Sequence, residues 1–141
     1  MSEPLSHPAL TAETLSVSIK RPPDLVWDIA SDVSLWPKFT RFLLAATLSS
    51  SQEYRLTTRL GSAVLRTHFD RDELPLDHVL IVPIRSTLVH ACRLVPNYYG
   101  CELVLTCVSR PREFRDDFER RVGHMRACVE RLRYLVEGPA T

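Results

Sequence analysis

The chain has 141 residues, 45% of them hydrophobic and 25% charged, which suits one globular domain. Its formal net charge of +1 gives no electrostatic basis for nucleic acid or an anionic membrane as the main partner. No apolar run approaches the ~20 residues of a membrane helix. The first ten residues also lack the pattern of a signal peptide, so we expect a cytoplasmic protein.

The clearest local pattern lies near the start of the chain. Residues 15–19 alternate apolar and polar side chains, which predicts a strand with one buried face. Pro22-Pro23 ends this strand and suits the first turn of a helix over residues 24–30. Ser31-Asp32 then offers a cap for a second short helix that ends at Trp36-Pro37.

Six further segments carry strand patterns and are joined mostly by short turns. With the first strand they predict an antiparallel meander of about seven strands. These segments are residues 42–49, 52–60, 63–70, 78–84, 87–95 and 101–108.

The last segment, residues 111–137, is predicted to be one long helix that ends at Gly138. Its apolar residues recur at spacings of three and four and so form a single stripe. The stripe consists of Phe114, Phe118, Val122, Met125, Val129, Leu132 and Val136.

The order Val-Ser-Ile-x-x-Pro-Pro-x-x-Val-Trp-x-x-x-x-Asp-Val-x-x-Trp-Pro-x-Phe at residues 17–39 resembles the opening of the START-like (SRPBCC) superfamily. That superfamily includes Bet v 1-like proteins, polyketide cyclase/dehydratases and coenzyme Q-binding proteins. The resemblance implies an α+β helix-grip fold, in which a curved antiparallel sheet wraps around the C-terminal helix and encloses a ligand cavity. We expect this domain to cover residues 13–138, after a flexible tail of residues 1–12.

The parity of the strands predicts which side chains face the cavity. Charged residues at 55, 59, 66, 70 and 93 need water, so their neighbours in sequence should point inward. The inward set is Tyr54, Leu56, Thr58, Leu65, Thr67, Phe69, His90, Cys92, Leu103, Leu105 and Cys107. A shift of one residue would instead turn Arg66, His68 and Asp70 inward and make them the active site.

His90 is the inward residue that titrates near neutral pH, so it is the candidate general acid or base. The alternative is a core histidine that only hydrogen-bonds to its surroundings. Tyr54 and Thr67 are candidate hydrogen-bond donors to a bound carbonyl, or simply space-filling core residues. Aromatase/cyclases of the superfamily place an arginine at the position of Thr67, so the resemblance argues against an aromatase-type mechanism.

Further residues are candidates for ligand contacts, with ordinary core packing or solvent exposure as the alternative. Trp27, Trp36 and Phe39 belong to the region that closes one end of the cavity in this superfamily. Arg121 and His124 flank the apolar stripe and reach either solvent or a pocket mouth. The full set of candidate ligand contacts adds Leu56, Thr58, Leu65, Phe69, Cys92, Leu103, Leu105, Cys107, Phe118, Val122 and Met125.

The four cysteines lack the close pairs of zinc sites and are expected to be buried free thiols. No metal motif, nucleophile elbow or phosphate-binding loop is present, so we expect no metal and no cofactor. We expect a monomer or homodimer whose partner is an apolar small molecule.

Two hypotheses for function remain. One is a cyclase or dehydratase acting on an apolar, carbonyl-bearing biosynthetic intermediate such as a polyketide. The other is a carrier for a lipid, quinone or antibiotic.

Overall fold

A computed structural model describes residues 11–70, 72, 74–82 and 86–138. In this part of the chain, seven strands form one antiparallel sheet, accompanied by two α-helices and one 3-10 helix, which confirms the predicted helix-grip fold. The elements are β1 (Ala12–Ile19), α1 (Pro23–Ala30), η2 (Val33–Lys38), β2 (Leu43–Ser50), β3 (Glu53–Thr58), β4 (Gly61–Phe69), β5 (Leu76–Val82), β6 (Ser86–Asn97), β7 (Gly100–Val108) and α2 (Arg115–Glu137). The expected tail lies almost wholly outside the described residues, as do the last two residues of the strand predicted at 78–84.

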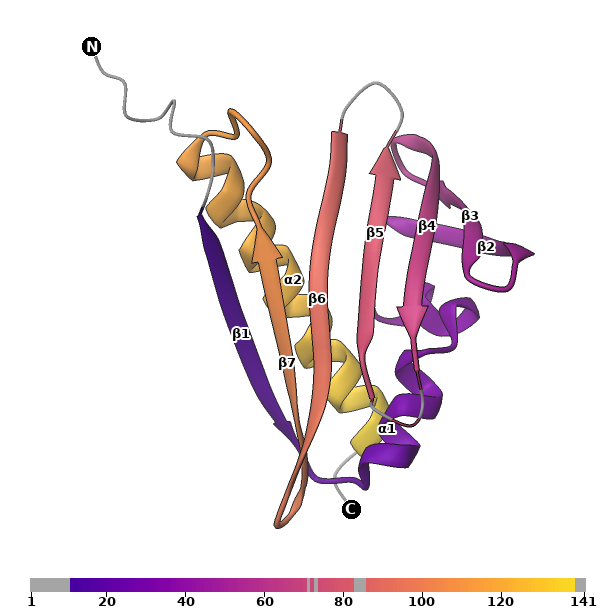
Figure 1. Cartoon of the computed structure of the whole chain (residues 1–141), viewed down its shortest axis with the longest axis vertical. Coiled ribbons are helices and arrows are strands. Elements are labelled where there is room, and N and C mark those ends of the chain that lie inside the picture. Colours follow the sequence, from indigo (N-terminus) through magenta and orange to yellow (C-terminus); the bar gives the residue numbers. More distant parts are fainter. Residues whose placement is uncertain (1–10, 71, 73, 83–85, 139–141) are drawn as a thin grey trace.

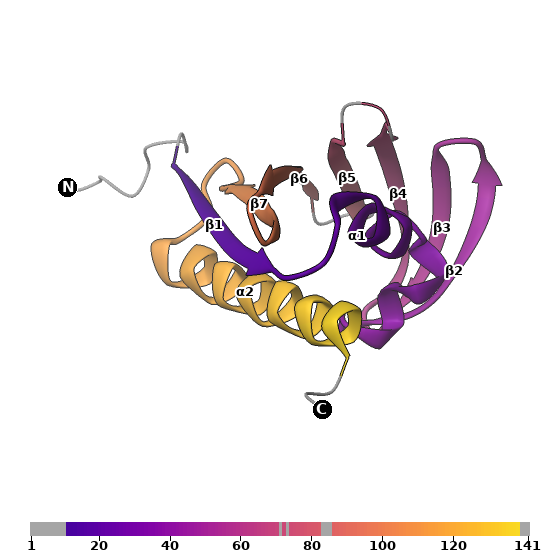
Figure 2. The same ribbon diagram turned by 90° about the horizontal axis from the view of Figure 1, so that it is seen from below.

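The sheet has the order β1-β7-β6-β5-β4-β3-β2. Strands β2 to β7 follow one another as a meander. Strand β1, the first in sequence, pairs with the last strand, β7, with Ala12 opposite Val108. The sheet is curved, and α2 lies across its concave side (Figures 1 and 2). No helix among the described residues is long and apolar enough to cross a bilayer.

The two short elements after β1 form where their turn chemistry predicts. Pro22 is the N-cap of α1, and Pro23 occupies its first turn, where a missing backbone N–H costs nothing. The Asp32 carboxylate caps η2 by accepting a hydrogen bond from the Ser34 N–H at 3.1 Å. The indole Nε1 of Trp36 donates to the Ala30 carbonyl at 2.9 Å and so fastens η2 to α1.

Helix α2 begins four residues later than predicted. Arg112 has a left-handed backbone with φ of 65°, and the Glu113 carboxylate accepts a hydrogen bond from the Arg110 N–H at 2.9 Å, so a turn precedes the helix. Phe114 is therefore the N-cap and is 63% exposed, which removes it from the apolar stripe. Met125 is half-buried, and the other stripe residues are buried: Phe118, Val122, Val129, Leu132 and Val136.

The buried side chains form two clusters. The outer core holds η2 against β2 to β5 through Val33, Leu43, Leu56, Ala63, Leu65 and Leu80. Trp36 and Phe69 pack against both clusters. The inner core joins α2, α1 and the C-cap of η2 to β1, β5, β6 and β7 through Leu15, Val17, Ile19, Val26, Ala30, Phe39, Leu76, Cys92, Leu94, Cys101, Leu103, Leu105, Cys107, Phe118, Val122, Val129, Leu132 and Val136.

The sheet register agrees with the predicted parity. On β4, Leu65 and Thr67 are buried, whereas Arg66 and His68 are exposed. The shifted register, in which Arg66, His68 and Asp70 would face the cavity, is therefore wrong for this structure.

Candidate functional site

A small, partly open cavity lies between α2, η2 and strands β5 to β7. Its volume is about 70 Å³. Its wall is mostly apolar, with the imidazole of His78 and the hydroxyl of Thr40 as the polar groups besides thiols. The lining consists of Ala30, Trp36, Phe39, Thr40, Leu76, His78, Cys92, Leu103, Leu105, Met125, Cys128, Val129 and Leu132.

A larger hollow of about 420 Å³ lies elsewhere, along the C-terminal part of α2. It is open to solvent and is lined by Lys38, Glu130, Arg131, Arg133, Tyr134 and Leu135. Because its side chains are largely charged and it encloses little, it offers no dry environment for an apolar ligand. The smaller cavity is the candidate site.

Two histidines meet at one end of the cavity. His78 on β5 and His90 on β6 are direct cross-strand partners, with ring centroids 4.9 Å apart. The Nδ1–H of His78 donates to the Leu76 carbonyl at 3.0 Å, since a carbonyl can only accept, and this tautomer leaves Nε2 as an acceptor. The ring of Trp36 meets His78 edge-on at 5.1 Å and fixes its orientation.

His90 is the more deeply buried of the two, with 4% of its surface exposed. Neither of its ring nitrogens has a hydrogen-bond partner within the described residues. Burial, followed by the nearby His78 and the positive charge of Arg121, lowers its pKa to about 3. Burial also lowers the pKa of His78. Both imidazoles are therefore neutral at pH 7, each able to donate one hydrogen bond and accept one.

A buried ion cluster stands beside this pair. The Arg121 guanidinium donates to both carboxylate oxygens of Glu113, at 3.2 and 2.9 Å, and to the Val108 carbonyl at 2.9 Å. The Arg110 guanidinium also binds Glu113, at 3.1 Å. Burial raises the pKa of Glu113, but the hydrogen bonds from Arg121 and Arg110 outweigh it and leave the pKa below its ordinary value. The carboxylate is therefore ionised.

The histidines and the ion cluster adjoin the same end of the cavity. His90 faces Cys107 across the β6–β7 pair, and the next inward pair, Cys92 with Leu105, lines the cavity. Two residues along a strand correspond to about 6.6 Å. On α2, Arg121 precedes the cavity residue Met125 by one turn, about 6 Å. His90 therefore lies two residues along β6, and Arg121 one turn along α2, from a residue of the apolar wall.

The structure brings together part of the predicted site. The predicted contacts that line this cavity are Trp36, Phe39, Cys92, Leu103, Leu105 and Met125. His90 does not line it but lies against His78, which does. The other predicted contacts lie outside the lining: Trp27, Leu56, Thr58, Leu65, Phe69, Cys107, Phe118, Arg121 and Val122.

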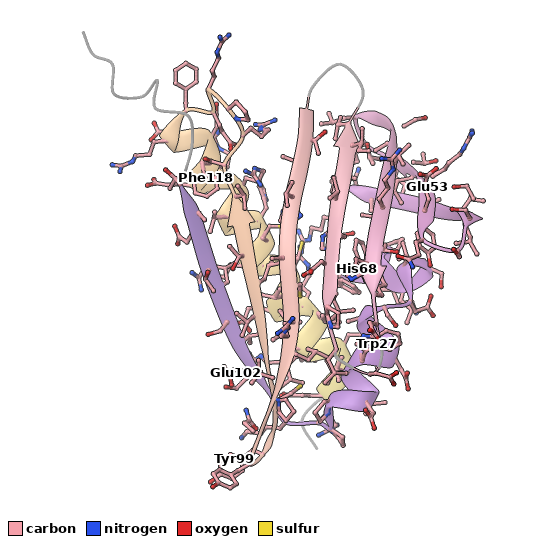
Figure 3. The ribbon with its side chains drawn as sticks, viewed as in Figure 1. Trp27, Glu53, His68, Tyr99, Glu102 and Phe118 are labelled. Atoms are coloured by element: carbon pink, nitrogen blue, oxygen red, sulfur yellow. The ribbon has the colours of Figure 1, made fainter. Side chains whose placement is uncertain are left out.

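The two other candidate catalytic residues also lie away from the cavity. The Thr67 hydroxyl donates to the Gln52 carbonyl at 3.3 Å, and Tyr54 is half-buried against the outer core. His124 is exposed, whereas the Arg121 side chain is only 15% exposed. Side chains at the rim of the fold point outward: Tyr99 projects from the tip of the β6–β7 hairpin (Figure 3).

Sequence reasoning missed His78. The predicted bounds did not reveal it, because strands at 78–84 and 87–95 joined by two residues would place residue 78 opposite residue 93, whereas in the structure it lies opposite residue 90. Since paired residues share a face, the inward assignment of His90 extends to His78.

The thiols offer no reactive group. Cys92, Cys101 and Cys107 are buried, Cys128 is half-buried, and all four are free. Burial raises the pKa of each, and that of Cys92 reaches about 12. Among the described residues, no group of three or more His, Cys, Asp or Glu side chains is arranged to hold a metal ion.

The fold matches solved structures closely in shape and weakly in sequence. The ZhuI aromatase/cyclase from Streptomyces sp. R1128 superposes with a TM-score of 0.75 at 18% identity, covering 90% of this chain and 93% of that one. A START superfamily protein from Mycobacterium smegmatis gives 0.73 at 12% identity, with 89% and 97% covered. Ara h 8.0201 gives 0.73 at 10% identity, with 89% and 97% covered.

Neither a protein-family profile nor a curated protein sequence matches the chain. The structural matches establish the fold that the opening motif predicts, the START-like helix-grip.

Proposed function

We propose that this START-like protein binds an apolar, carbonyl-bearing small molecule in the cavity between α2 and the sheet and promotes its dehydration or cyclisation. The observation that supports this is the neutral His78–His90 pair at the end of an otherwise apolar cavity. A dry wall with a few convergent polar groups is typical of sites for small organic ligands. The ZhuI neighbour, named as an aromatase/cyclase, has the same fold and so is consistent with this class.

The proposed roles follow from the tautomers. His90 lies against His78 just outside the present lining, and once the ligand enters past the side chains of the wall it donates its N–H to the ligand's carbonyl oxygen, which stabilises the negative charge that develops there. His78, with Nδ1–H held by Leu76, uses Nε2 to take the proton from the adjacent carbon. In dehydration, the β-hydroxyl then leaves as water with that proton. In cyclisation, the enolate carbon attacks a second carbonyl of the same molecule, and the alkoxide that forms takes the proton back from His78 Nε2.

The size of the cavity limits the ligand. Sites for drug-sized molecules usually have ~300–1,000 Å³, whereas this cavity has about 70 Å³. The present volume is that of about two water molecules and is about half that of a cavity known to hold benzene, so it admits only the smallest fragment without change. A larger substrate requires the aromatic side chains of Trp36 and Phe39 to move, because they form the wall contributed by η2 and its C-cap.

Conversion of a small β-hydroxy ketone tests the proposal. With 4-hydroxy-4-phenylbutan-2-one, dehydration produces a conjugated enone that is followed by ultraviolet absorbance. We expect His78→Gln or His90→Gln to lower turnover by ~100-fold, the usual contribution of general acid–base catalysis. The matched control is His68→Gln, since His68 is exposed on the outer face of β4. Equal turnover in the variants and the wild type would remove the histidines from the mechanism.

A carrier without catalysis is the second candidate, and one observation favours it. Burial lowers the pKa of both His78 and His90, which makes them weak bases at neutral pH, so the pair suits hydrogen bonding better than proton transfer. A carrier would return the hydroxy ketone unchanged after saturating binding. The expected monomeric or dimeric state and cytoplasmic location stay predictions, to be checked by light scattering and cell fractionation.

A further inference from the structure

The cavity wall is least covered where the end of η2 faces α2. The wall residues contributed by β6 and β7 are buried: Cys92, Leu103 and Leu105. The half-buried wall residues are Trp36 and Thr40 at the end of η2, Met125 and Cys128 on α2, and His78, whose ring meets Trp36. The boundary between residues 36–40 and α2, which we call the seam, is therefore the side of the cavity nearest to solvent.

One arginine ties the two sides of the seam together. The Arg131 Nε on α2 donates to the carbonyl of Phe39, the C-cap of η2, at 3.0 Å, and its Nη2 donates to Cys128 Sγ at 3.7 Å. Phe39 and Cys128 both line the cavity, whereas Arg131 lines the open hollow beside it. Within the described residues, no second hydrogen bond joins residues 33–42 to α2.

We propose that the ligand enters the cavity through this seam and that Arg131 is the positioning residue that keeps it closed. The inference rests on the proposed ligand site and adds its entrance. A cavity of about 70 Å³ must widen to admit a substrate, and Phe39 forms part of the wall that has to move. Because Arg131 also lines the solvent-open hollow, water solvates its guanidinium when the bond breaks. The polar cost of opening is then about one hydrogen bond to a charged group.

Cys92 is the reporter of this opening, because it lines the cavity and is buried. A buried thiol reacts only from an opened state, so its labelling rate follows the population of that state. Cys101 and Cys107 are 0% exposed and lie outside the lining, so they report the opening of the core itself. Cys128 is replaced by alanine throughout, since Arg131 contacts its sulfur and would alter its reactivity directly.

The test compares two arginine variants by iodoacetamide labelling, followed by mass spectrometry of the cysteine peptides at early times. We expect Arg131→Met to speed the labelling of Cys92 relative to Cys101 and Cys107 by about tenfold, the factor that one hydrogen bond to a charged group provides. The matched control is Arg133→Met. Arg133 lines the same hollow but pairs with Glu130, at 2.7 Å, so its loss should leave the ratio unchanged.

A measurement with the arginines intact needs neither variant to fold. Opening the seam exposes little surface, so the labelling rate of Cys92 should be nearly independent of urea at low concentration. Labelling of Cys101 and Cys107 requires the core to unfold and should rise steeply with urea. If the Cys92 rate rises as steeply as theirs from the lowest urea concentration, the entrance is overturned.

The outcomes also separate this proposal from the proposed function. Equal acceleration of all three cysteines in Arg131→Met, or the same ratio in both arginine variants, would overturn the role of Arg131. Turnover of the hydroxy ketone by the wild type would then still support the proposed function. Selective labelling of Cys92 in Arg131→Met without turnover of the hydroxy ketone by any variant would support the entrance and reject catalysis.

Discussion

The two halves of the sheet differ in what covers them. Strands β1, β7 and β6 pack against α2 and share the larger inner core, whereas β2, β3 and β4 have η2 and the smaller outer core (Figure 2). On β2, Leu43 is buried, but Leu44 and Leu48 are 51% and 59% exposed. The half of the sheet that α2 covers, β1, β7 and β6, therefore has a continuous hydrophobic core, and we call it the covered half. We call the less covered half, β2 to β4, the wing.

This difference explains where the candidate site lies. A ligand cavity needs walls on both sides, and α2 supplies the second wall for β6 and β7. The unpartnered nitrogens of His90 and Arg121 and the small cavity all belong to the covered half or its border with β5. The wing contributes hydrophobic packing, in which Trp36 contacts its core, rather than candidate catalytic groups. The predictions below test whether the two halves of the sheet also differ in what they contribute to the free energy of unfolding.

The largest contrast is expected from two leucines. Leu94, in the inner core, is 2% exposed, and Leu48, on β2, is 59% exposed. We expect Leu94→Ala to lower the free energy of unfolding by about 2–5 kcal/mol, since it leaves a cavity in packed core. Leu48→Ala should change it by less than about 0.5 kcal/mol. Urea denaturation measures both, and similar losses would mean that the wing is as well packed as the inner core.

Two hairpin glycines give the next contrast. A Cβ on Gly100, in the β6–β7 turn, would collide with the Ile19 carbonyl oxygen and lie 2.6 Å from the Arg21 nitrogen, both backbone atoms that cannot rotate away. We expect Gly100→Ala to cost about 3 kcal/mol, the upper range of overpacking. Gly61, in the β3–β4 turn, has open space around it and a φ of 118°, so Gly61→Ala should cost about 1 kcal/mol from backbone strain alone. Equal thermal shifts for the two variants would contradict the close contact.

The histidines predict how stability depends on pH. The folded-state pKa of His90 lies near 3 and that of His78 is also lowered, so between pH 6.5 and 5 the unfolded chain binds more protons than the folded one. Stability is therefore full above about pH 6.5 and should fall by up to about 1.4 kcal/mol per pH unit on account of His90 as the pH decreases toward 3, and His78 adds a loss in the same direction.

The variants His90→Gln and His68→Gln check this slope. The first should flatten the decrease measured by urea denaturation at pH 6.5, 6 and 5, and the second, at an exposed position on β4, should leave it unchanged. An unaltered slope in His90→Gln would show that its imidazole is charged or solvated in the folded protein.

The smallest expected effect is a difference in the alkylation rates of the cysteine thiols, which is a measure of access rather than of stability. All four cysteines lie on β6, β7 and α2, and burial raises the pKa of each. We expect iodoacetamide at pH 8 to modify Cys128 first, because it is half-buried, and Cys92 far more slowly. Mass spectrometry of the native protein follows the order, with urea-unfolded protein as the control. Rapid labelling of Cys92 would mean that the cavity opens readily.

Much of the fold was predictable because its signals are local. Alternation fixed the inward faces of β3, β4, β6 and β7, and Pro22-Pro23 and Asp32 marked the turns and caps of α1 and η2. The start of α2 was not predictable from periodicity, because the turn at Arg112 depends on hydrogen bonds between Arg110 and Glu113.

The candidate site was less accessible to sequence reasoning. Inward parity identified His90, Cys92 and Leu105, yet it treated all inward positions alike and so included Tyr54 and Thr67, which the curvature of the sheet carries away from α2. The partnership of Arg121 with Glu113 joins a helix to the turn before it, and no spacing rule encodes that contact.

The pairing of β1 with β7 also sets an order of events during synthesis. Strand β1 pairs with β7, where Ala12 lies opposite Val108, and it also packs against α2, which follows β7 in the sequence. On the ribosome, the hairpins from β2 to β6 can form as they emerge, while β1 must wait for β7, which follows it by about 80 residues. Strand β1 is thus translated before the other strands and yet is among the last to be built into the sheet.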